Sequence, residues 1–512
     1  MKLARASLNL RLHDAQSCIA REYGFSSWAD VKAYVVARVE DPADRAASQR
    51  QWLSLVYGSD VAGGQDRARP SVAARMLEEK PDLAGGDAYV ACAVGDEAEL
   101  RQMTQDDPSW INRPGGPLNI PPLVAVTHST LLRVPAYREQ LRACARFLLD
   151  AGADPDQAIG SRDRWAPGSL SEPSTELSLS ALYGAAGKNH DAELARLLLD
   201  AGANPNDGES LYHSLENIAC VRHLLAAGAR IKGTNALYRV LDLDNIDTLR
   251  LLLAHGADPN ESASSVPIAD WGSPLLWAIR RRRSRAHIEA LLQAGANPLA
   301  RTPDGASAFV LAMRFGLPEV AELLRAVGGA ESASDEERFI AACALGDEAK
   351  ARQILSARPD LPAALSEPQL RLLPELAAQS CFDAVKLMVM LGWPIATPGG
   401  DWNASALNQA VFRGDAALAD VLLAHGASWN EKHGYGDDVC GTLSFASFNE
   451  PVDGGDWLGC ARALVAHGLP VALADPQGPK GVIVDGRHSN FPDELTAFFL
   501  AAATAASETS GR

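Results

Sequence analysis

One hydrophobic phrase recurs along the chain: two leucines, two spacer residues and then a Gly-Ala step. Such leucines lie on the buried face of a helix, and the glycine ends that helix because the position after it usually needs a left-handed backbone. Proline three residues later, as at Pro205 and Pro298, cannot continue the helix. We therefore predict that a helix ends at each copy. The full copies begin at Leu148, Leu198, Leu224, Leu252, Leu291 and Leu422, and weaker copies begin at Leu323 and Leu464.

A second amphipathic helix is predicted ahead of each phrase. Its start carries a serine followed by proline or alanine and then a large apolar residue, at Ser180, Ser273, Ser307 and Ser405. A hydroxyl suits the N-cap position, and proline or alanine suits the first helical turn. The repeated unit is thus a helix, a tight turn, a second helix and a turn-rich loop.

This unit resembles the ankyrin repeat. The best matches are Ser273 to Ala278 followed by Ile288 to Asn297, and Ser180 to Ala185 followed by Leu194 to Asn206. The resemblance extends over roughly residues 69–475. It implies an all-α fold, an α-solenoid of helix–turn–helix repeats with helical end caps.

The spacing of the repeats departs from the regular pattern. Successive landmark glycines lie 50 residues apart between Gly152 and Gly202 but only 26 apart between Gly202 and Gly228, against about 33 in the family. We interpret residues 162–175 and 261–270 as loop insertions and residues 211–228 as a truncated unit.

The array is expected to fall into two sub-arrays, residues 70–330 and 331–475. Between Gly328 and Gly392 the phrase is lost, but helical periodicity persists and predicts about two divergent units. Phe339 to Asp347 echoes Tyr89 to Asp96, so each sub-array opens with the same kind of unit.

The two ends differ from the array. Residues 1–40 predict two helices separated at Gly24, which resemble a short leader found ahead of many bacterial ankyrin arrays. Residues 41–69 form a linker and short helix. In residues 476–512 we expect a loop with a small hairpin near Val482 to Gly486, a capping helix from Phe491 to Ala503, and a frayed tail over 507–512.

Composition and charge narrow the classes of partner. Hydrophobic residues make up 47% and charged residues 22%, which is typical of a globular chain, and the formal net charge is -17. Such a charge is repelled by phosphate backbones and anionic lipid, so neither a nucleic acid nor a membrane is expected as a partner. The scattered cysteines without a Cys-x-x-Cys pair and the lack of a signal peptide or spanning segment predict a cytoplasmic location.

Two other functions stay open at this point. The N-terminal helices nearly fit a DNA-binding helix-turn-helix through Ala20, Gly24, Ser26 and Val31, but the second helix offers only Lys32 as a basic residue besides one arginine near its end. That pattern would suit a nucleic-acid-binding regulator. An enzyme with an unrecognised site is the third class.

Motifs for catalysis are absent from the sequence. The phosphate-loop, His-Glu-x-x-His and Gly-x-Ser-x-Gly patterns do not occur. The Gly434 to Asp438 stretch is interpreted as a loop, and His255, His425 and His467 as residues that cap helix ends. We therefore expect no enzyme activity, no cofactor, and no catalytic or metal site.

Two surface features are candidates for binding a partner protein. One is a basic run, which could equally be a solvated turn; the other is a set of loop tryptophans, which could equally pack against neighbouring loops. These candidates are Arg280, Arg281, Arg282, Arg283, Trp165, Trp271, Trp402 and Trp429. The sequence thus predicts a non-catalytic protein–protein interaction scaffold, whose partner carries an acidic or phosphorylated patch and docks on the concave face and finger loops.

Overall fold

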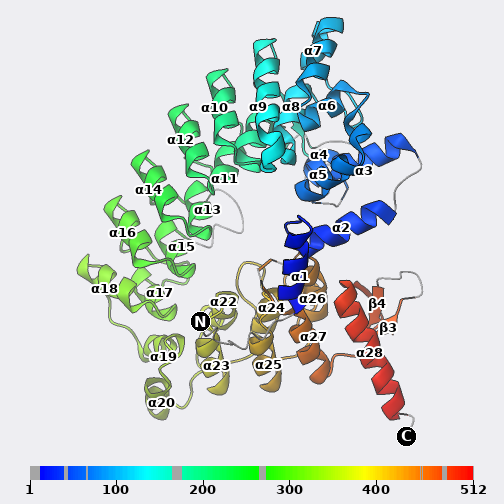
Figure 1. The fold of residues 1–512 in the computed structure, drawn as a ribbon. Helices are drawn as coiled ribbons and strands as arrows, with labels where there is room; N and C mark the ends of the chain where they lie inside the picture. The colour runs from blue at the N-terminus through cyan, green and yellow to red at the C-terminus, as the bar shows by residue number, and fades with distance from the viewer. Residues whose placement is uncertain are drawn as a thin grey trace, which may run out of the picture. The chain divides into compact units, whose positions relative to one another are not determined.

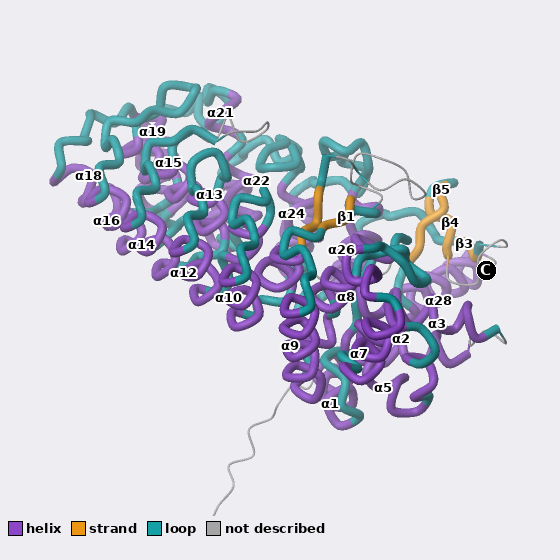
Figure 2. Tube along the Cα trace, turned by 90° about the horizontal axis from the view of Figure 1, so that it is seen from above, coloured by secondary structure: helices purple, strands orange, loops and turns teal. Residues whose placement is uncertain are grey.

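The computed structural model describes most of the chain and is mostly helical, with few strands (Figure 2). The described residues are 12–39, 44–64, 67–163, 174, 176–263, 272–449, 451–452, 454–475 and 481–510. The chain divides into two compact units, Met1–Asp258 and Pro259–Arg512, and each is described by itself.

The first unit contains helices in pairs and one short two-stranded sheet. Its α-helices are α1 (Leu12–Glu22), α2 (Trp28–Val39), α3 (Arg45–Tyr57), α4 (Ser59–Ala62), α5 (Pro70–Glu79), α6 (Ala88–Val94), α7 (Glu97–Asp106), α8 (Pro122–His128), α9 (Pro135–Asp150), α10 (Ala192–Asp200), α11 (Ser210–Ser214), α12 (Ile218–Ala226), α13 (Ala236–Asp242) and α14 (Ile246–Ala254). Three 3-10 helices and a π-helix lie between them: η1 (Pro81–Ala84), η2 (Pro108–Asn112), η3 (Thr130–Arg133) and η4 (Tyr183–Lys188). The strands β1 (Ala158–Gly160) and β2 (Ser178–Ser180) pair antiparallel.

The leucine phrases form the second helix of each pair, as predicted. Helices α9, α10, α12 and α14 lie side by side in chain order (Figure 1). The first leucine of each full copy, at positions such as Leu148 and Leu198, is fully buried, whereas Leu323 of a weaker copy is half-buried. Glycines such as Gly152 and Gly202 follow with φ of 96° and 98°, the left-handed backbone that glycine adopts without strain.

The first helix of the repeat that begins near Ser180 is π-helical. We expected an ordinary helix there, but η4 contains two glycines and two alanines within six residues. A Cβ at Gly184 would stand 2.4 Å from Cδ2 of His128, so only glycine allows this close approach. The wider turn therefore accompanies tight packing against the buried His128 ring.

The segment ahead of the repeats is packed onto them. In α3, Trp52 and Tyr57 are buried. The Trp52 Nε1 donates to the carbonyl of Ala73 at 3.0 Å, and the Tyr57 hydroxyl donates to the carbonyl of Ala125 at 2.8 Å. Helices α1 and α2 meet at Gly24, whose φ of 82° ends the first helix where the sequence predicts a stop.

The second unit is built in the same way. Its α-helices are α15 (Pro274–Arg280), α16 (Arg285–Gln293), α17 (Ala308–Arg314), α18 (Pro318–Ala326), α19 (Asp335–Ala344), α20 (Glu348–Ala357), α21 (Glu367–Leu370), α22 (Leu372–Ala378), α23 (Phe382–Met390), α24 (Ala406–Phe412), α25 (Ala416–Ala424), α26 (Val439–Asn449), α27 (Trp457–Ala466) and α28 (Asp493–Ser510). Helices α19 with α20 and α22 with α23 are the two helix pairs expected where the leucine phrase is lost. Leu291, Leu422 and Leu464 are fully buried.

The C-terminal part combines a small sheet with the last helix. Strands β3 (Leu473–Ala474), β4 (Gly481–Val484) and β5 (Arg487–Asn490) form an antiparallel sheet in that order, and the hairpin turn between β4 and β5 is the one predicted. Helix α28 packs on β4 and α27, with Leu495 and Phe499 buried. The helix continues to Ser510, so the prediction of a frayed tail is wrong for residues 507–510. The alanine-rich segment before them favours continuation of the helix.

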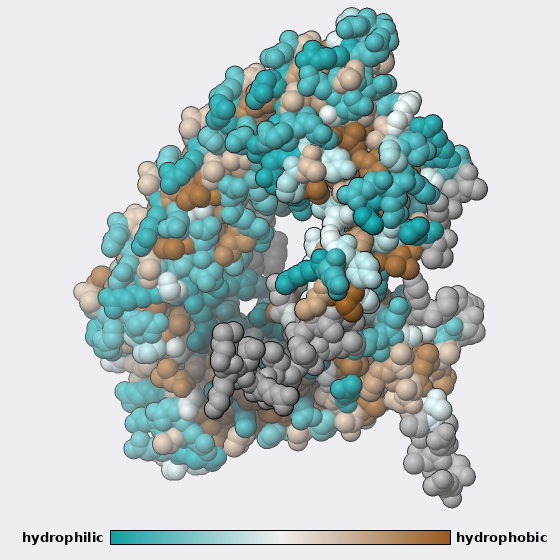
Figure 3. Space-filling view, viewed as in Figure 1, coloured by the Kyte–Doolittle hydropathy of each residue, from teal (hydrophilic) through white to brown (hydrophobic). Residues whose placement is uncertain are grey.

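On the face shown in Figure 3, hydrophilic side chains predominate, and hydrophobic side chains form smaller, scattered patches. Among the described residues, no helix combines the length and the apolar character that crossing a membrane would require. Cys18 is exposed, Cys381 is half-buried, and the other six cysteines are buried; none forms a disulfide.

Candidate partner-binding groove

A groove of about 600 Å³ lies on the second unit, along the first helices of its repeats. Its walls come from the end of α15, from α17, α22 and α24, and from the loops that precede α17 and α24. We call it the arginine groove. Its charged and aromatic lining residues are Arg280, Arg281, Arg314, Arg371, Arg413, Asp304, Glu375, Asp401, Trp277, Phe315, Trp402 and Phe412.

Arg281 connects two walls of the groove. Its guanidinium lies 4.0 Å from the centroid of the buried Trp277 ring, which is a cation–π contact. The same group donates to Oδ2 of Asp401 at 2.6 Å, although the two residues are 120 positions apart. Through these two contacts, Arg281 holds the loop before α24 against the end of α15.

Arg280 is paired across the groove as well. Its Nη1 lies 3.6 Å from Oε1 of Glu375, and its carbonyl accepts a hydrogen bond of 2.8 Å from Nε2 of Gln379. Burial raises the pKa of the Glu375 carboxyl, and the nearby arginines oppose that shift. The Arg280–Glu375 pair is therefore partly desolvated, and the two opposite charges compensate each other in the groove wall.

A buried ion-pair network stiffens the adjoining wall. Arg314 donates to both carboxylate oxygens of Glu337, at 2.9 and 2.7 Å, and to Asp304 at 2.9 Å. Burial opposes the charge of Arg314, but these hydrogen bonds outweigh it and raise its pKa. Glu337 also accepts from Gln369 at 2.8 Å, so this arginine is fully committed to holding α17, α19 and α21 together.

Two arginines of the groove form no direct ion pair with a described acid, although Arg371 is near enough to Glu375 to oppose the rise in the pKa of that carboxyl. Arg371 stands at the start of α22, and Arg413 follows the end of α24. Within the part of the chain that the structure describes, neither forms an ion pair; Arg413 donates from Nε to the hydroxyl of Ser380 at 2.8 Å. The sequence does not single out either residue, because each is one arginine outside any basic run. The signal that distinguishes them is their place beside the termini of first helices.

Aromatic rings continue the groove along α24 and α26. The centroids of Trp402 and Phe412 are 5.5 Å apart, and those of Phe412 and Phe445 are 6.3 Å apart in a stacked arrangement. Trp402 also donates from Nε1 to Oε1 of Gln409 at 3.2 Å. The Gln409 side chain is buried, and its Nε2 has no hydrogen-bond partner among the described residues.

The structure brings together some of the residues singled out from the sequence. Arg280, Arg281 and Trp402 line the arginine groove. Arg282 instead donates to the carbonyl of Phe315 at 2.6 Å, and Arg283 donates to the carbonyl of Arg281 at 2.9 Å, so both serve the turn after α15.

The remaining tryptophans do not add to the groove. Trp429 is half-buried in the loop after α25 and does not line it. Trp165 and Trp271 lie outside the described residues.

The acids of the loop before α26 are paired within the chain, because Arg487 donates to Asp437 at 2.7 Å and to Asp438 at 2.9 Å.

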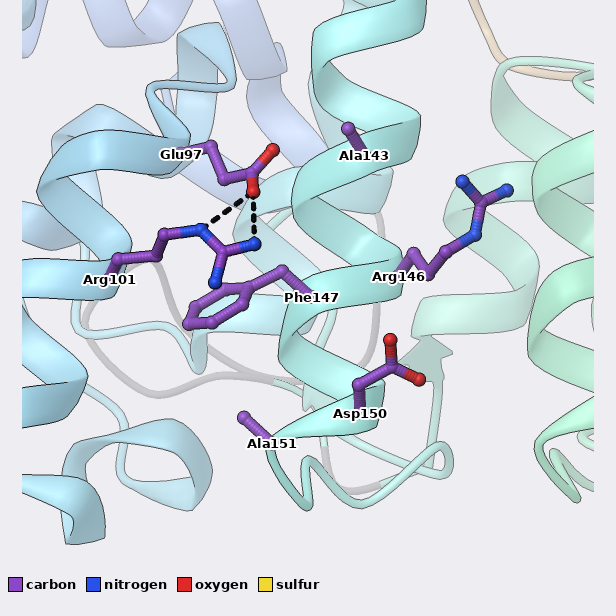
Figure 4. A pocket seen from close by; sticks show the side chains of 7 residues that line it. All are labelled: Glu97, Arg101, Ala143, Arg146, Phe147, Asp150 and Ala151. Carbon is purple, nitrogen blue, oxygen red and sulfur yellow. Dashed lines mark hydrogen bonds and ion pairs between the residues drawn. The ribbon is translucent and has the colours of Figure 1, made fainter.

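A second, smaller hollow of about 380 Å³ lies on the first unit between α7 and α9 (Figure 4). Arg101 lies with its guanidinium carbon 4.5 Å from the Phe147 ring centroid and donates from Nε to Glu97 at 2.7 Å. Its central cation is thus neutralised by a neighbour one helical turn away. Two arginines and two acids line this hollow, so its lining carries no net charge, whereas five arginines and three acids line the arginine groove.

No metal site was found in the described part of the chain, where no three His, Cys, Asp or Glu side chains are grouped so as to hold an ion. His255 and His425 each hydrogen-bond through Nδ1 to a carbonyl of the preceding helical turn, at 2.9 and 2.7 Å. They serve helix ends, as predicted.

Comparison with known proteins gives matches among solved structures. No protein-family model matches the chain, and no curated protein matches it. Among solved structures, an ankyrin repeat domain from Acinetobacter baumannii AYE is similar to it, with 27% sequence identity and a TM-score of 0.26. The likeness covers 29% of this chain and 81% of the other chain. At this TM-score it supports no conclusion about function.

Proposed function

We propose that the chain is an ankyrin-type α-solenoid that acts as a non-catalytic protein-interaction scaffold, and that the arginine groove is its partner interface. The recurrent leucine phrase and the serial stacking of the helix pairs in each unit support the solenoid. In such arrays the first helices and the loops beside them present the binding face.

One observation carries the assignment of the interface. Arg371 and Arg413 line a groove that also contains Trp277, Trp402 and Phe412, and neither arginine lies within ion-pair distance of an acid of the described residues. Aromatic and arginine side chains are enriched among residues that dominate binding energy in protein interfaces. A structural role alone would favour neutralising both cations, as happens for Arg281 and Arg314.

A nucleic-acid-binding role is the second candidate, and the contacts of the N-terminal helices weigh against it. In α2, Oδ1 of Asp30 forms an ion pair of 2.9 Å with Nη1 of Arg69, and Nε of Arg38 lies 3.8 Å from Oε2 of Glu79 in α5. Through these contacts α2 packs on α5, and Lys32 is the cation of α2 that forms no ion pair with a described residue.

We further propose a reducing compartment such as the cytoplasm, because all eight cysteines are free.

The proposal is tested by affinity capture with the full chain and a steric block of the groove. Ala378 lines the groove and is half-buried at the end of α22, so Ala378→Trp fills it without changing charge. The matched control is Ala357→Trp, on the exposed end of α20. We expect a protein captured by the intact chain and by the control to be lost by Ala378→Trp.

Two results would contradict the proposal. Retention of the captured protein by Ala378→Trp would remove the groove as the interface. Failure of the intact chain to capture any protein saturably and reproducibly would contradict the scaffold function itself. Circular dichroism of each variant checks that the helices are intact.

A further inference from the structure

We infer that the arginine groove binds an extended peptide segment of a partner, in which acidic side chains are followed by aromatic or large aliphatic side chains. This inference rests on the proposed function and names the chemistry of the partner. Carboxylates would dock on Arg371 and Arg413, and the apolar side chains on an aromatic strip consisting of Trp402, Phe412, Phe445 and Phe448.

Charge is the first argument. Five arginines and three acids line the groove. Arg280, Arg281 and Arg314 are each paired with an acid of the chain. Arg371 acts on Glu375 only from beyond ion-pair distance, and Arg413 uses Nε for Ser380, so the Nη groups of both arginines form no ion pair with a described residue. A planar guanidinium matches the two oxygens of a carboxylate, and the partly enclosed groove strengthens that contact. In a chain of net charge -17, this local positive charge selects an anionic segment.

Buried donors without an acceptor also favour a ligand that carries acceptor oxygens. Nε2 of Gln409 and Nε of Arg280 are buried donors for which no described residue provides an acceptor. Gln409 is only 3% exposed and lines the groove. Buried polar groups nearly always have a hydrogen-bond partner, so an acceptor entering the groove would complete this wall. Carboxylate and peptide carbonyl oxygens are such acceptors.

The aromatic strip indicates that the occupant is longer than a small molecule. Phe445 and Phe448 lie one helical turn apart on α26 and are 57% and 54% exposed. Phe445 stacks on Phe412, which lines the groove, so the apolar surface continues past the groove along α26. Large exposed aromatic side chains in a continuous patch mark an interaction surface. An extended peptide reaches both the arginines and this strip.

Selection of peptides tests the chemistry directly. The probe is a phage-displayed library of random 12-residue peptides, selected on the intact full-length chain. Selected peptides are then synthesised and titrated by fluorescence anisotropy against intact protein and variants. We expect peptides with two or more acidic residues next to an aromatic or large aliphatic residue. Binding should weaken at least about tenfold in Arg371→Ala/Arg413→Ala, because two charge-assisted contacts are lost.

Matched variants separate the groove from general charge. Arg352→Ala/Arg462→Ala removes the same charge from exposed helical positions outside the groove and should leave binding unchanged. Phe445→Ser/Phe448→Ser changes exposed residues only, so folding is retained, and it should weaken binding through loss of apolar contact.

Other outcomes overturn the inference. Neutral or basic peptides that Ala378→Trp blocks would disprove the acidic segment yet keep the groove as an interface. Equal weakening by both arginine pairs would show a nonspecific charge effect. If no selected peptide is sensitive to Ala378→Trp, both the inference and the groove assignment fail.

Discussion

The Lys188 ammonium donates to both carboxylate oxygens of Asp60, at 2.8 and 2.7 Å, across 128 positions of sequence. It also donates to the carbonyl of Tyr57 at 2.7 Å. Burial lowers the pKa of Lys188, and Asp60 opposes that shift. This pair ties the helices ahead of the repeats to the π-helix η4, so the N-terminal segment is part of the packed first unit.

We predict that the Lys188–Asp60 pair stabilises the first unit cooperatively. Lys188→Met should lower the free energy of unfolding by about 2 kcal/mol, because a partly buried carboxylate loses its partner. In the double variant with Asp60→Leu, much of that loss should be recovered. A double-mutant cycle from urea unfolding measures the coupling, expected at about 1–3 kcal/mol. Additive losses would show that the two groups act independently.

The buried His128 predicts a pH dependence of stability. Its Nε2 donates to the carbonyl of Ser180 at 2.9 Å, and its Nδ1 has no partner among the described residues. Burial, and then Lys188, lower the pKa of His128 to about 4. The unfolded chain therefore binds the proton first as pH falls. The contribution of His128 is present above about pH 6.5 and is lost progressively toward pH 4.

The corresponding measurement compares unfolding of the intact chain and of His128→Gln at about pH 7.5 and pH 5. His128 should account for about 2 kcal/mol of the stability lost over that interval. The variant, which keeps a donor for Ser180 but does not titrate, should lose correspondingly less. Identical losses in the two proteins would contradict the neutral, buried state of His128.

Two glycines with left-handed backbones predict different costs of adding a methyl group. At Gly414, with φ of 66°, a Cβ would stand 2.6 Å from Cα of Gly455; at Gly426, with φ of 101°, nothing lies within 4 Å. Gly426→Ala should cost about 1–2 kcal/mol from backbone strain alone. Gly414→Ala should cost about 1–3 kcal/mol more, because the clash is with backbone that cannot yield. Equal midpoints of urea unfolding for the two variants would disprove this local packing.

The cysteines should differ sharply in reactivity. Cys18 is exposed, whereas burial raises the pKa of thiols such as Cys343, to about 12. In native conditions a thiol reagent such as DTNB should modify Cys18 rapidly and Cys381 more slowly, since only the thiolate attacks. The six buried thiols should react only with unfolding. Rapid reaction of more than two thiols would mean that these helices are not packed as described, and Cys18→Ser identifies the fast phase.

Local features of the chain were predictable because their causes lie within a few residues. A leucine pair followed by Gly152 or Gly202 specifies a buried helical face and a left-handed end, whatever surrounds it. The β4–β5 hairpin follows from turn residues beside an apolar run in the same way. The end of α28 was misjudged, because helix propensity decides such an end only weakly.

The arginine groove was only partly predictable, because its properties depend on which distant residues meet. The basic run drew attention to Arg280 and Arg281, which line the groove, but only tertiary structure places Asp401 beside Arg281 and thereby neutralises it. The same folding leaves Arg371 and Arg413, two isolated residues in the sequence, as the groove arginines that form no direct ion pair with a described residue. Helix periodicity and turns are written in neighbouring residues. Charge compensation depends on the side chains that surround each charge, and in the folded chain these come from distant repeats.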